Sequence, residues 1–147
     1  MEENMKSIKQ ILAEKTKPNT IVAPNITVLS AIELMRERDI GAVMVVDGDR
    51  LVGIFTERDC LHKVSSVGDD PRDVLVSEVM TKQVRCITPD MEVSEGLALM
   101  TERHFRHLPV LDNKRNILGI VSIGDLVKEK ISDQSFVIDQ MERYITS

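Results

Sequence analysis

The chain has 147 residues, a formal net charge of −5 and a pI near 5.2. This length suits one compact domain or two small halves that share a core, and with 42% hydrophobic but only 3% aromatic residues that core must be aliphatic. The acidic balance and the absence of a run of Lys or Arg argue against binding to DNA or RNA, which needs concentrated positive charge.

The predicted elements of the first half follow from apolar spacing and turn residues. Val28, Ile32 and Met35 recur at i, i+4 and i+7, which is one face of a helix, and Asp-Gly between two apolar runs is a strong hairpin signal. In chain order we expect a helix over 7–15, a strand over 20–23 that ends at Pro24, a helix from 28 capped by Asn25 or Thr27, two strands (A-V-M-V-V and L-V-G-I-F), and a short helix over 58–64.

The second half repeats this order. Residues 24–38 align with residues 89–103 at a constant offset, since 89 − 24 = 65 and 100 − 35 = 65. After a linker at 65–72, we expect a helix over 73–80, a strand over 84–88, a helix from 93 capped by Asp90, two strands (L-P-V-L and I-L-G-I-V), a short helix over 124–131 and a separate packing helix over 132–145. The expected fold class is α/β, with two β-α-β-β-α units packed about a pseudo-twofold axis and extra N- and C-terminal helices.

Each repeat ends in the same seven-residue pattern. G-I-F-T-E-R-D (53–59) and G-I-V-S-I-G-D (119–125) both place a glycine, two apolar residues, a hydroxyl, two variable residues and an aspartate in order. We call Thr56–Asp59 the first motif and Ser122–Asp125 the second motif.

The physical chemistry of these motifs allows two interpretations. The hydroxyl falls at a helix N-cap, where unpaired N–H groups attract an anion such as phosphate. The aspartate one turn on can accept two hydrogen bonds from a ribose diol, and the glycine leaves room for a flat base or a neighbouring backbone. The same spacing is also an ordinary capping box in proteins that bind nothing there.

The two motifs, with V-M-T at 79–81 and R-H-L-P-V at 106–110, resemble a tandem pair of CBS domains, also called a Bateman module, over about residues 16–131. The resemblance implies a non-catalytic sensor that binds AMP first, or ADP, ATP, NAD or S-adenosylmethionine, in two clefts between the paired domains, with no metal cofactor. It also implies boundaries: CBS domain 1 at 16–66, a linker and helix at 67–78, CBS domain 2 at 79–131 and a C-terminal helix at 132–147.

Carried over residue by residue, the resemblance implies two sets of ligand-binding residues. One cleft would use Asp59 for ribose, with Thr56 and Arg58 near the phosphate, and would be closed by Arg106, His107 and Pro109. The other would use Asp125 for ribose and Ser122 near the phosphate, with a wall around the base made of Thr20, Ile40, Gly41 and Ala42.

This chain departs from the family pattern at two places. Arg106 precedes His107, whereas nucleotide-sensing members often place His before Arg, so the sequence leaves open which of them reaches a phosphate. Ile123 and Gly124 stand where the first motif has Glu57 and Arg58. The second cleft lacks the arginine, and we therefore expect unequal affinities.

Other chemistries have weaker support. His104, His107 and Cys86 lack the spacing of a zinc site, and no nucleophile with a base and an orienting group, and no phosphate-binding lysine loop, indicates catalysis. A structural dimerisation module with empty clefts is the alternative function, although both aspartates are intact. We expect a stand-alone homodimer whose partners are an adenosine-containing small molecule and an unidentified regulated protein, with no nucleic acid and no membrane.

The sequence also carries an expectation about location. Its start, M-E-E-N-M-K, lacks the basic and apolar regions of a secretory signal, and Cys60 and Cys86 form no pairing motif. The densest apolar stretch, residues 42–46, is far shorter than the roughly 20 residues that cross a bilayer. We expect a cytoplasmic, reduced protein.

Overall fold

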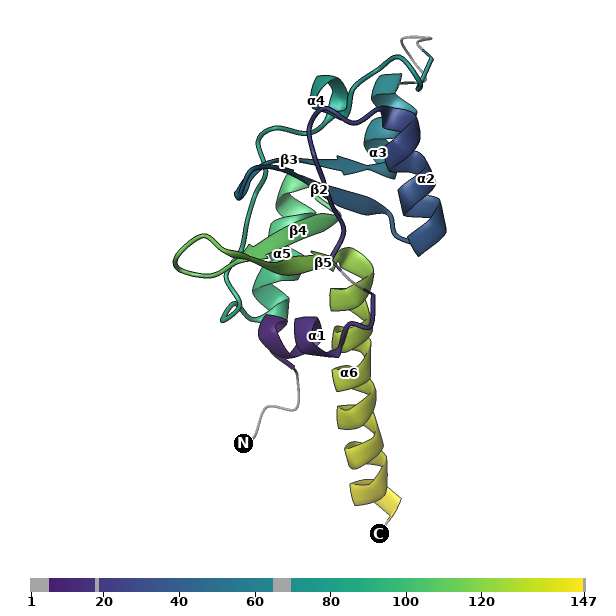
Figure 1. Cartoon of the computed structure of the whole chain (residues 1–147). Coiled ribbons are helices and arrows are strands. Elements are labelled where there is room, and N and C mark those ends of the chain that lie inside the picture. The colour runs from purple at the N-terminus through teal and green to yellow at the C-terminus, as the bar shows by residue number, and fades with distance from the viewer. Residues whose placement is uncertain (1–5, 18, 65–69, 147) are drawn as a thin grey trace. The chain divides into compact units, whose positions relative to one another are not determined.

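The computed structural model describes residues 6–17, 19–64 and 70–146, and the chain divides into two compact units. Thr16–Arg85 is called the N-terminal unit, and Met1–Lys15 together with Cys86–Ser147 is called the C-terminal unit. Each unit combines helices with a small sheet (Figure 1). The predicted α/β class with two repeated units and added terminal helices is confirmed, while most of the predicted linker lies outside the described residues.

The N-terminal unit contains a three-stranded sheet in the order β1-β2-β3. Strand β1 runs parallel to β2, and β2 runs antiparallel to β3. The turn between β2 and β3 contains Gly48 at φ 67°, a left-handed conformation that suits glycine, so the hairpin prediction is confirmed. The elements are β1 (Ile21–Val22), α2 (Val28–Arg38), β2 (Ala42–Asp47), β3 (Arg50–Thr56), α3 (Glu57–Asp59), the π-helical turn η1 (Cys60–Val64) and α4 (Val76–Val79).

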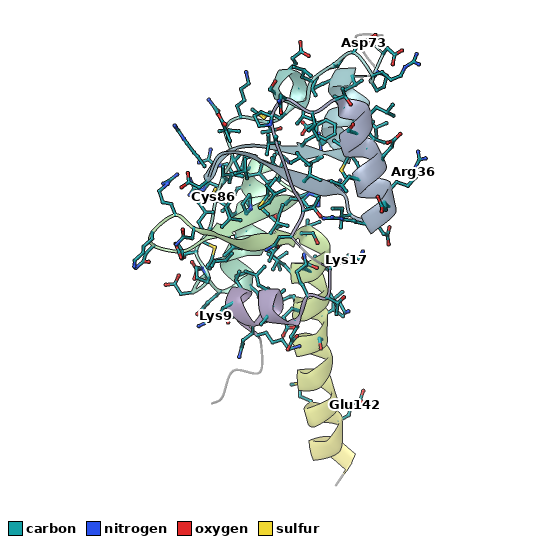
Figure 2. All side chains as sticks on the ribbon, in the orientation of Figure 1. Lys9, Lys17, Arg36, Asp73, Cys86 and Glu142 are labelled. Carbon is teal, nitrogen blue, oxygen red and sulfur yellow. The ribbon has the colours of Figure 1, made fainter. Side chains whose placement is uncertain are left out.

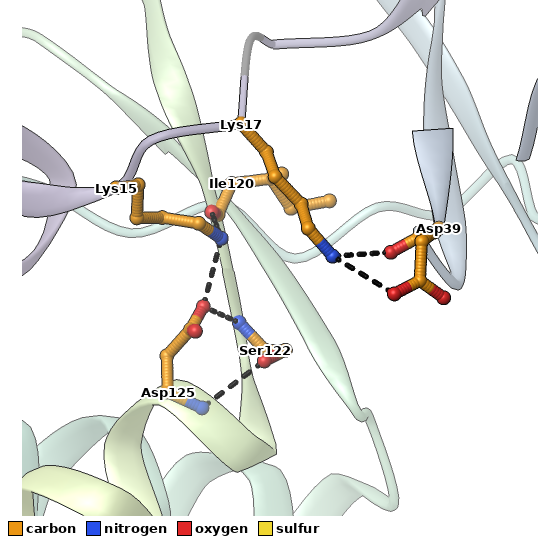
Figure 3. A network of polar contacts seen from close by, with 6 residues as sticks. All are labelled: Lys15, Lys17, Asp39, Ile120, Ser122 and Asp125. Atoms are coloured by element: carbon orange, nitrogen blue, oxygen red, sulfur yellow. Dashed lines mark hydrogen bonds and ion pairs between the residues drawn. The ribbon is translucent and has the colours of Figure 1, made fainter. Parts of the chain in front are cut away.

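Helix α2 begins and ends through local contacts. The hydroxyl of Thr27, one of the two predicted caps, accepts a hydrogen bond from the Ser30 amide at 3.1 Å. At the other end Asp39 is left-handed, with φ 53°. Lys17 Nζ donates to the Asp39 carbonyl oxygen at 2.5 Å (Figure 3), which places a cation at the negative end of the helix dipole.

Helix α4 is shorter than the helix predicted over 73–80. Leu75 is extended and forms an antiparallel bridge with Thr27, so the helix begins only at Val76. The amide of Val76 then donates to the Ile26 carbonyl at 2.9 Å, which ties the helix to the segment before α2. This tertiary pairing shortens the helix that the local sequence predicts.

The C-terminal unit contains an antiparallel two-stranded sheet, β4-β5. The strand predicted over 84–88 is reduced to one parallel bridge, Ile87 to Val110. The next ladder bond toward the N-terminus would need the N–H of residue 109, which is a proline and has none. The elements are α1 (Ile8–Glu14), α5 (Val93–Arg103), β4 (His107–Leu111), β5 (Ile117–Ser122) and α6 (Ile123–Thr146).

Two predictions about helices of the C-terminal unit are wrong. The two helices expected over 124–131 and 132–145 form the single 24-residue helix α6, because no glycine or proline after Gly124 interrupts it. The predicted cap Asp90 is not used: the N-cap of α5 is Glu92, which makes no side-chain cap bond. Much of the α6 surface beyond residue 132 has side chains outside the described residues.

Each unit has its own aliphatic core. The N-terminal core is built from Val22, Val28, Ala31, Met35, Val43, Val45, Phe55, Val64, Val74 and Val76. The C-terminal core is built from Ile8, Ile11, Ile87, Val93, Met100, Leu108, Val110, Val121 and Leu126. Charged side chains such as Lys9, Arg36 and Asp73 lie on the outside (Figure 2).

Helix α1 belongs to the core of the C-terminal unit although it begins the chain. Ile8 is fully buried there, which stabilises the fold by about 2 kcal/mol. The Lys9 amide donates to the Pro89 carbonyl at 3.1 Å, and Ile11 packs in the same cluster. The position of α1 therefore fixes the backbone at Lys15, its C-cap.

Candidate functional sites at two strand–helix junctions

The first motif forms a reciprocal capping box at the end of β3. The Asp59 amide donates to Thr56 Oγ1 at 3.1 Å, and the Thr56 amide donates to Asp59 Oδ2 at 3.0 Å. Thr56 is the N-cap, as the sequence predicts. The capping interpretation is therefore realised at this motif.

The second carboxylate oxygen of Asp59 is also occupied. Oδ1 accepts a hydrogen bond from Thr81 Oγ1 at 3.0 Å and pairs with Lys63 Nζ at 3.1 Å. The side chain of Asp59 is only 8% exposed. A ribose diol could bind Asp59 only by replacing one of these partners, because each carboxylate oxygen already accepts from the protein.

Gly53 explains how Thr81 reaches Asp59. A Cβ at Gly53 would lie 2.5 Å from Met80 Sδ and 3.0 Å from the Thr81 carbonyl oxygen. Because glycine has no side chain, the chain at Met80 and Thr81 can lie against β3, where Ile54 and Thr81 exchange two backbone hydrogen bonds of 3.0 and 2.9 Å. Of the two reasons that the sequence offers for this glycine, the close approach of a neighbouring backbone is the one observed.

The residues predicted to surround a base lie in the N-terminal unit beside the first motif. Ala42 pairs with Thr56 across the β2–β3 ladder, and the Glu57 amide donates to the Gly41 carbonyl at 3.1 Å. The resemblance assigns Gly41 and Ala42 to the cleft of Asp125, so within this unit the structure brings together residues assigned to different clefts. That assignment stays a prediction.

Three further predicted residues of this unit differ in exposure. Thr20 is buried, and its hydroxyl accepts a hydrogen bond from Arg38 Nη1 at 3.1 Å. Ile40 is half-buried and packs on the core, with its amide bonded to the Met35 carbonyl at 3.0 Å. Arg58 is exposed, one residue before Asp59.

The second motif repeats the capping box at the end of β5. The Ser122 amide donates to Asp125 Oδ2 at 2.8 Å, and the Asp125 amide donates to Ser122 Oγ at 3.1 Å (Figure 3). Here, however, the aspartate side chain is 27% exposed. The two motifs therefore share their backbone geometry and differ in the burial of the carboxylate.

Lys15 holds the carboxylate of the second motif. Its Nζ donates to Asp125 Oδ2 at 2.8 Å and to the Ile120 carbonyl at 2.9 Å (Figure 3). Burial by itself would raise the pKa of Asp125, but hydrogen bonds from Lys15 and Ser122 and the charge of Lys15 outweigh it and hold that pKa below its ordinary value. Asp125 is therefore an ionised acceptor at neutral pH.

His107 lies next to this ion pair. It faces Ser122 across the β4–β5 ladder, and its Nδ1 is buried with no hydrogen-bond partner among the described residues. Burial lowers the pKa of His107, Lys15 lowers it further, Asp125 raises it in part, and Arg106 lowers it again. The imidazole is therefore neutral at pH 7.

The remaining predicted residues of the C-terminal unit contribute backbone contacts. The Arg106 carbonyl accepts a hydrogen bond from the Ile123 amide at 2.8 Å, while the residue itself is exposed. Pro109 is buried in β4, opposite Ile120, and its carbonyl accepts from the Ile87 amide at 2.9 Å. Arg106, His107, Pro109, Ser122 and Asp125 thus come from one strand pair and the helix that follows it.

The prediction from sequence missed the groups that contact the two carboxylates, Lys15 and Thr81, but the repeat contains a signal for both. Lys15 aligns with Met80 at the repeat offset, since 80 − 15 = 65, so the segments before the first strand of each copy correspond. The segment before copy two supplies Thr81 to the first motif, and the segment before copy one supplies Lys15 to the second. Extending the repeat alignment upstream would have identified both segments.

The described residues were also compared with what a metal site, a reactive cysteine or a membrane-spanning helix would require. Within residues 6–17, 19–64 and 70–146, no three His, Cys, Asp or Glu side chains lie together as a metal ion would need. Burial raises the pKa of the Cys60 and Cys86 thiols, and the Arg115 charge opposes this at Cys86. None of the described helices combines the length and apolar character needed to cross a membrane.

Comparison with known proteins identifies the family. The chain matches the CBS domain family over residues 8–66 and again over residues 76–132. Together these two ranges cover most of its length. The chain therefore belongs to the CBS domain family and carries two CBS domains in tandem.

Individual relatives agree with this assignment. A solved CBS-domain protein from Burkholderia ambifaria MC40-6 is 45% identical, with a TM-score of 0.83 over 88% of this chain and 96% of that chain. The solved CBS domain pair of protein MJ0100, in complex with 5′-methylthioadenosine and S-adenosyl-L-methionine, is 25% identical, with a TM-score of 0.73 over 84% of this chain and 98% of that chain.

A curated relative of similar sequence is longer than this chain. An uncharacterised 17.7 kDa protein of Acidianus ambivalens is 39% identical over 109 residues, which is 74% of this chain and 65% of that protein. The chain spans between 60% and 65% of the length of this relative and of two other curated relatives.

Proposed function

We propose that this chain is a non-catalytic sensor that binds an adenosine-containing ligand at its hydroxyl-x-x-Asp motifs and regulates another polypeptide. AMP ranks first among the ligands, followed by ADP, ATP, NAD and S-adenosylmethionine. The similarity to the MJ0100 domain pair, which binds 5′-methylthioadenosine and S-adenosyl-L-methionine, supports the adenosine class.

The observation that carries the proposal is the state of Asp125. Its carboxylate is ionised and partly exposed, and the hydrogen bonds that it accepts from Lys15 and from the Ser122 amide both go to Oδ2. Among the described residues Oδ1 has no partner, so this oxygen can accept from a ribose diol without breaking a protein contact. The adjacent helix N-terminus, with Gly124 exposed, leaves a side-chain-free approach for a phosphate.

The other predicted ligand residues take roles according to their chemistry. Thr56 and Arg58 would lie near a phosphate at the first motif, and Ser122 would lie near one at the second. His107, neutral and half-buried, would act as a hydrogen-bonding group. Thr20, Ile40, Gly41 and Ala42 remain the residues proposed to line a base.

A second function, a structural dimerisation module, is favoured by one observation at the first motif. Asp59 is buried and both of its carboxylate oxygens are occupied by protein groups, as a purely structural capping box requires. If both motifs behaved in this way, the chain would bind no nucleotide. We also propose a homodimer, which light scattering of the purified chain would test.

Thermal unfolding against a ligand panel separates the two functions. A ligand that binds the native state raises its stability by mass action, about 2.7 kcal/mol at one hundred times Kd. The protein, first stripped of co-purified nucleotide, is heated with AMP, ADP, ATP, NAD, NADH, S-adenosylmethionine or GTP. A rise in Tm with adenosine ligands and none with GTP is expected, and no rise with any of them would support the structural module.

A further inference from the structure

Each motif aspartate binds one residue from the segment that precedes a copy of the repeat, and these two residues differ in charge. The segment before copy two contributes Thr81, whose neutral hydroxyl donates to Asp59 at 3.0 Å. The segment before copy one contributes Lys15, whose ammonium group donates to Asp125 at 2.8 Å. The second motif therefore holds a cation that is absent from its own sequence, where Gly124 stands in the position of Arg58.

Lys15 is held firmly in place by helix α1. The helix is anchored by Ile8 and Ile11 in the core of the C-terminal unit, and Lys15 is its C-cap. The Lys15 side chain is 29% exposed, so part of it can be reached from solvent. Its position depends on the core rather than on a loop.

The hydrogen-bond inventory of Lys15 leaves one donor. A lysine ammonium has three N–H groups. Two of them are used by Asp125 Oδ2 and the Ile120 carbonyl, and the third has no acceptor among the described residues. An anionic group of a ligand bound through Asp125 Oδ1 can take this third N–H while both existing contacts remain.

The unused N–H of Lys15, rather than a net positive charge, would favour such an anion. Asp125 is the acidic side chain that pairs with it, and His107 contributes no charge because the imidazole is neutral. Without a ligand anion, Lys15 and Asp125 cancel each other. A neutral nucleoside would gain only the contacts to Asp125, whereas a nucleotide would gain a charge-assisted hydrogen bond as well.

We propose that Lys15 determines the ligand specificity of the second motif, selecting adenosine ligands that carry an anionic group close to the ribose over neutral nucleosides. The proposal rests on the proposed function, because it assigns a ligand class to the same site. Lys15 then supplies a cation to the motif that lacks a counterpart of Arg58. The sequence difference at Gly124 is compensated by a residue 109 positions earlier in the chain, since 124 − 15 = 109.

Two backbone amides report on the two motifs separately in the intact chain. The Thr56 and Ser122 amides each donate to their own motif aspartate, so their NMR signals respond to a ligand at that carboxylate. Titrating the full chain with AMP and with adenosine, while following both signals, gives an affinity for each motif and each ligand. The variants are Lys15→Met and Lys15→Arg, with Lys9→Met as the matched control, since Lys9 is an exposed lysine of the same helix.

The expected result is a selective loss at one motif. Lys15→Met should weaken AMP binding reported by Ser122 about tenfold, because one partly exposed charged hydrogen bond is lost, and should leave adenosine binding unchanged. Lys15→Arg should restore AMP binding, and Lys9→Met should behave as the natural chain does. Signals at Thr56 should not change between variants.

Other outcomes overturn the inference in distinguishable ways. If AMP shifts the Ser122 signal with equal affinity in the natural chain and in Lys15→Met, the ion pair is only structural and the proposed function stands. If Lys15→Met weakens AMP and adenosine equally, Lys15 positions Asp125 and does not select an anion. If neither ligand shifts either signal in the natural chain, the proposed function fails and this inference fails with it.

Discussion

Asp59 and Asp125 occupy the same place in two copies of one unit, yet the Asp59 side chain is 8% exposed and the Asp125 side chain is 27% exposed. Both close the same capping box with the hydroxyl residue before them. Asp59 adds Thr81 and Lys63 on its other oxygen, while within the described part of the chain Asp125 adds only Lys15, on the oxygen already in use. The same hydroxyl-x-x-Asp spacing thus yields one carboxylate with both oxygens bonded and one whose Oδ1 has no partner among the described residues.

The two copies of the hydroxyl-x-x-Asp pattern therefore separate two contributions that an aspartate can make: it can stabilise the fold or be available to a ligand. Burial and saturation of hydrogen bonds make a carboxylate stabilise the fold, because removing it leaves its partners unsatisfied. Partial exposure and a spare lone pair make it available to a ligand. We expect the first motif to contribute mainly to stability and the second mainly to ligand binding. Four measurements test this difference.

The largest expected effect is the loss of stability on removing each aspartate. Asp59→Ala should lower the free energy of unfolding by about 2–4 kcal/mol, since the cap is lost and the half-buried donors at Thr56 and Thr81 lose their acceptor. Asp125→Ala should cost only about 1 kcal/mol, because water can reach Ser122 and Lys15. Urea unfolding monitored by circular dichroism measures both.

A control variant makes that comparison specific. Asp49→Ala removes an exposed carboxylate from the β2–β3 turn and should change stability by less than about 0.5 kcal/mol. Equal losses for Asp59→Ala and Asp125→Ala would show that the two motifs are energetically alike, and the contrast would be abandoned.

The next effect concerns the glycine that admits the Thr81 segment. Gly53→Ala should destabilise the chain by about 1–3 kcal/mol, because the new Cβ meets Met80 Sδ at 2.5 Å and the Thr81 carbonyl at 3.0 Å. Gly124→Ala is the matched variant: its Cβ meets Ser122 Oγ at 3.5 Å, an ordinary contact, so stability should stay unchanged or rise slightly. Thermal unfolding of both variants gives the answer, and a harmless Gly53→Ala would contradict the packing role of this glycine.

A smaller difference should appear in the salt dependence of the two contacts. A double-mutant cycle between Lys15→Met and Asp125→Asn should give a coupling of about 0.5–1 kcal/mol at low salt. In about 1 M NaCl, where the Debye length is ~3 Å, this coupling should fall because both groups are partly exposed.

The contact of the first motif provides the contrast in the same salt series. A cycle between Thr81→Val and Asp59→Asn should give a coupling that salt barely changes, because one partner is neutral and the carboxylate is buried. A coupling between Lys15 and Asp125 that persisted undiminished in high salt would mean that this pair is as shielded as Asp59.

The smallest expected difference lies in the pH dependence near His107. Its folded-state pKa is lowered, chiefly by burial, so the unfolded chain takes up the proton first as the pH falls. The stability contributed by neutral His107 is therefore fully present above about pH 6.5 and is lost as the pH falls below that value.

Replacing His107 isolates this contribution. His107→Gln should flatten the fall in stability between about pH 7 and pH 5, as followed by urea unfolding at a series of pH values. Asp125, whose pKa is also lowered, loses its contribution only as the pH falls below its ordinary value of 3.8, whereas the His107 contribution begins to fall at about pH 6.5. A variant with the same slope as the natural chain would show that His107 is not the titrating group.

Much of the fold follows from patterns that act over a few residues. The spacing of Val28, Ile32 and Met35 predicts α2, the Asp-Gly turn predicts the β2–β3 hairpin, and Thr56 and Ser122 are placed at strand–helix junctions where hydroxyl residues cap. The repeat predicts the second copy from the first. These features are local because hydrogen bonding within a helix, a turn or a cap involves neighbours in the chain.

The sequence by itself thus determined the duplicated α/β unit, the family and the two candidate aspartates. Only the tertiary structure decided that α6 is one helix and that α1 packs in the core of the C-terminal unit. It also decided that the Asp59 carboxylate is buried while that of Asp125 is partly exposed. The physical reason is distance along the chain: Thr81 is 22 residues from Asp59 and Lys15 is 110 residues from Asp125. Contacts of that separation are set by how the cores place each backbone, and no local pattern encodes them.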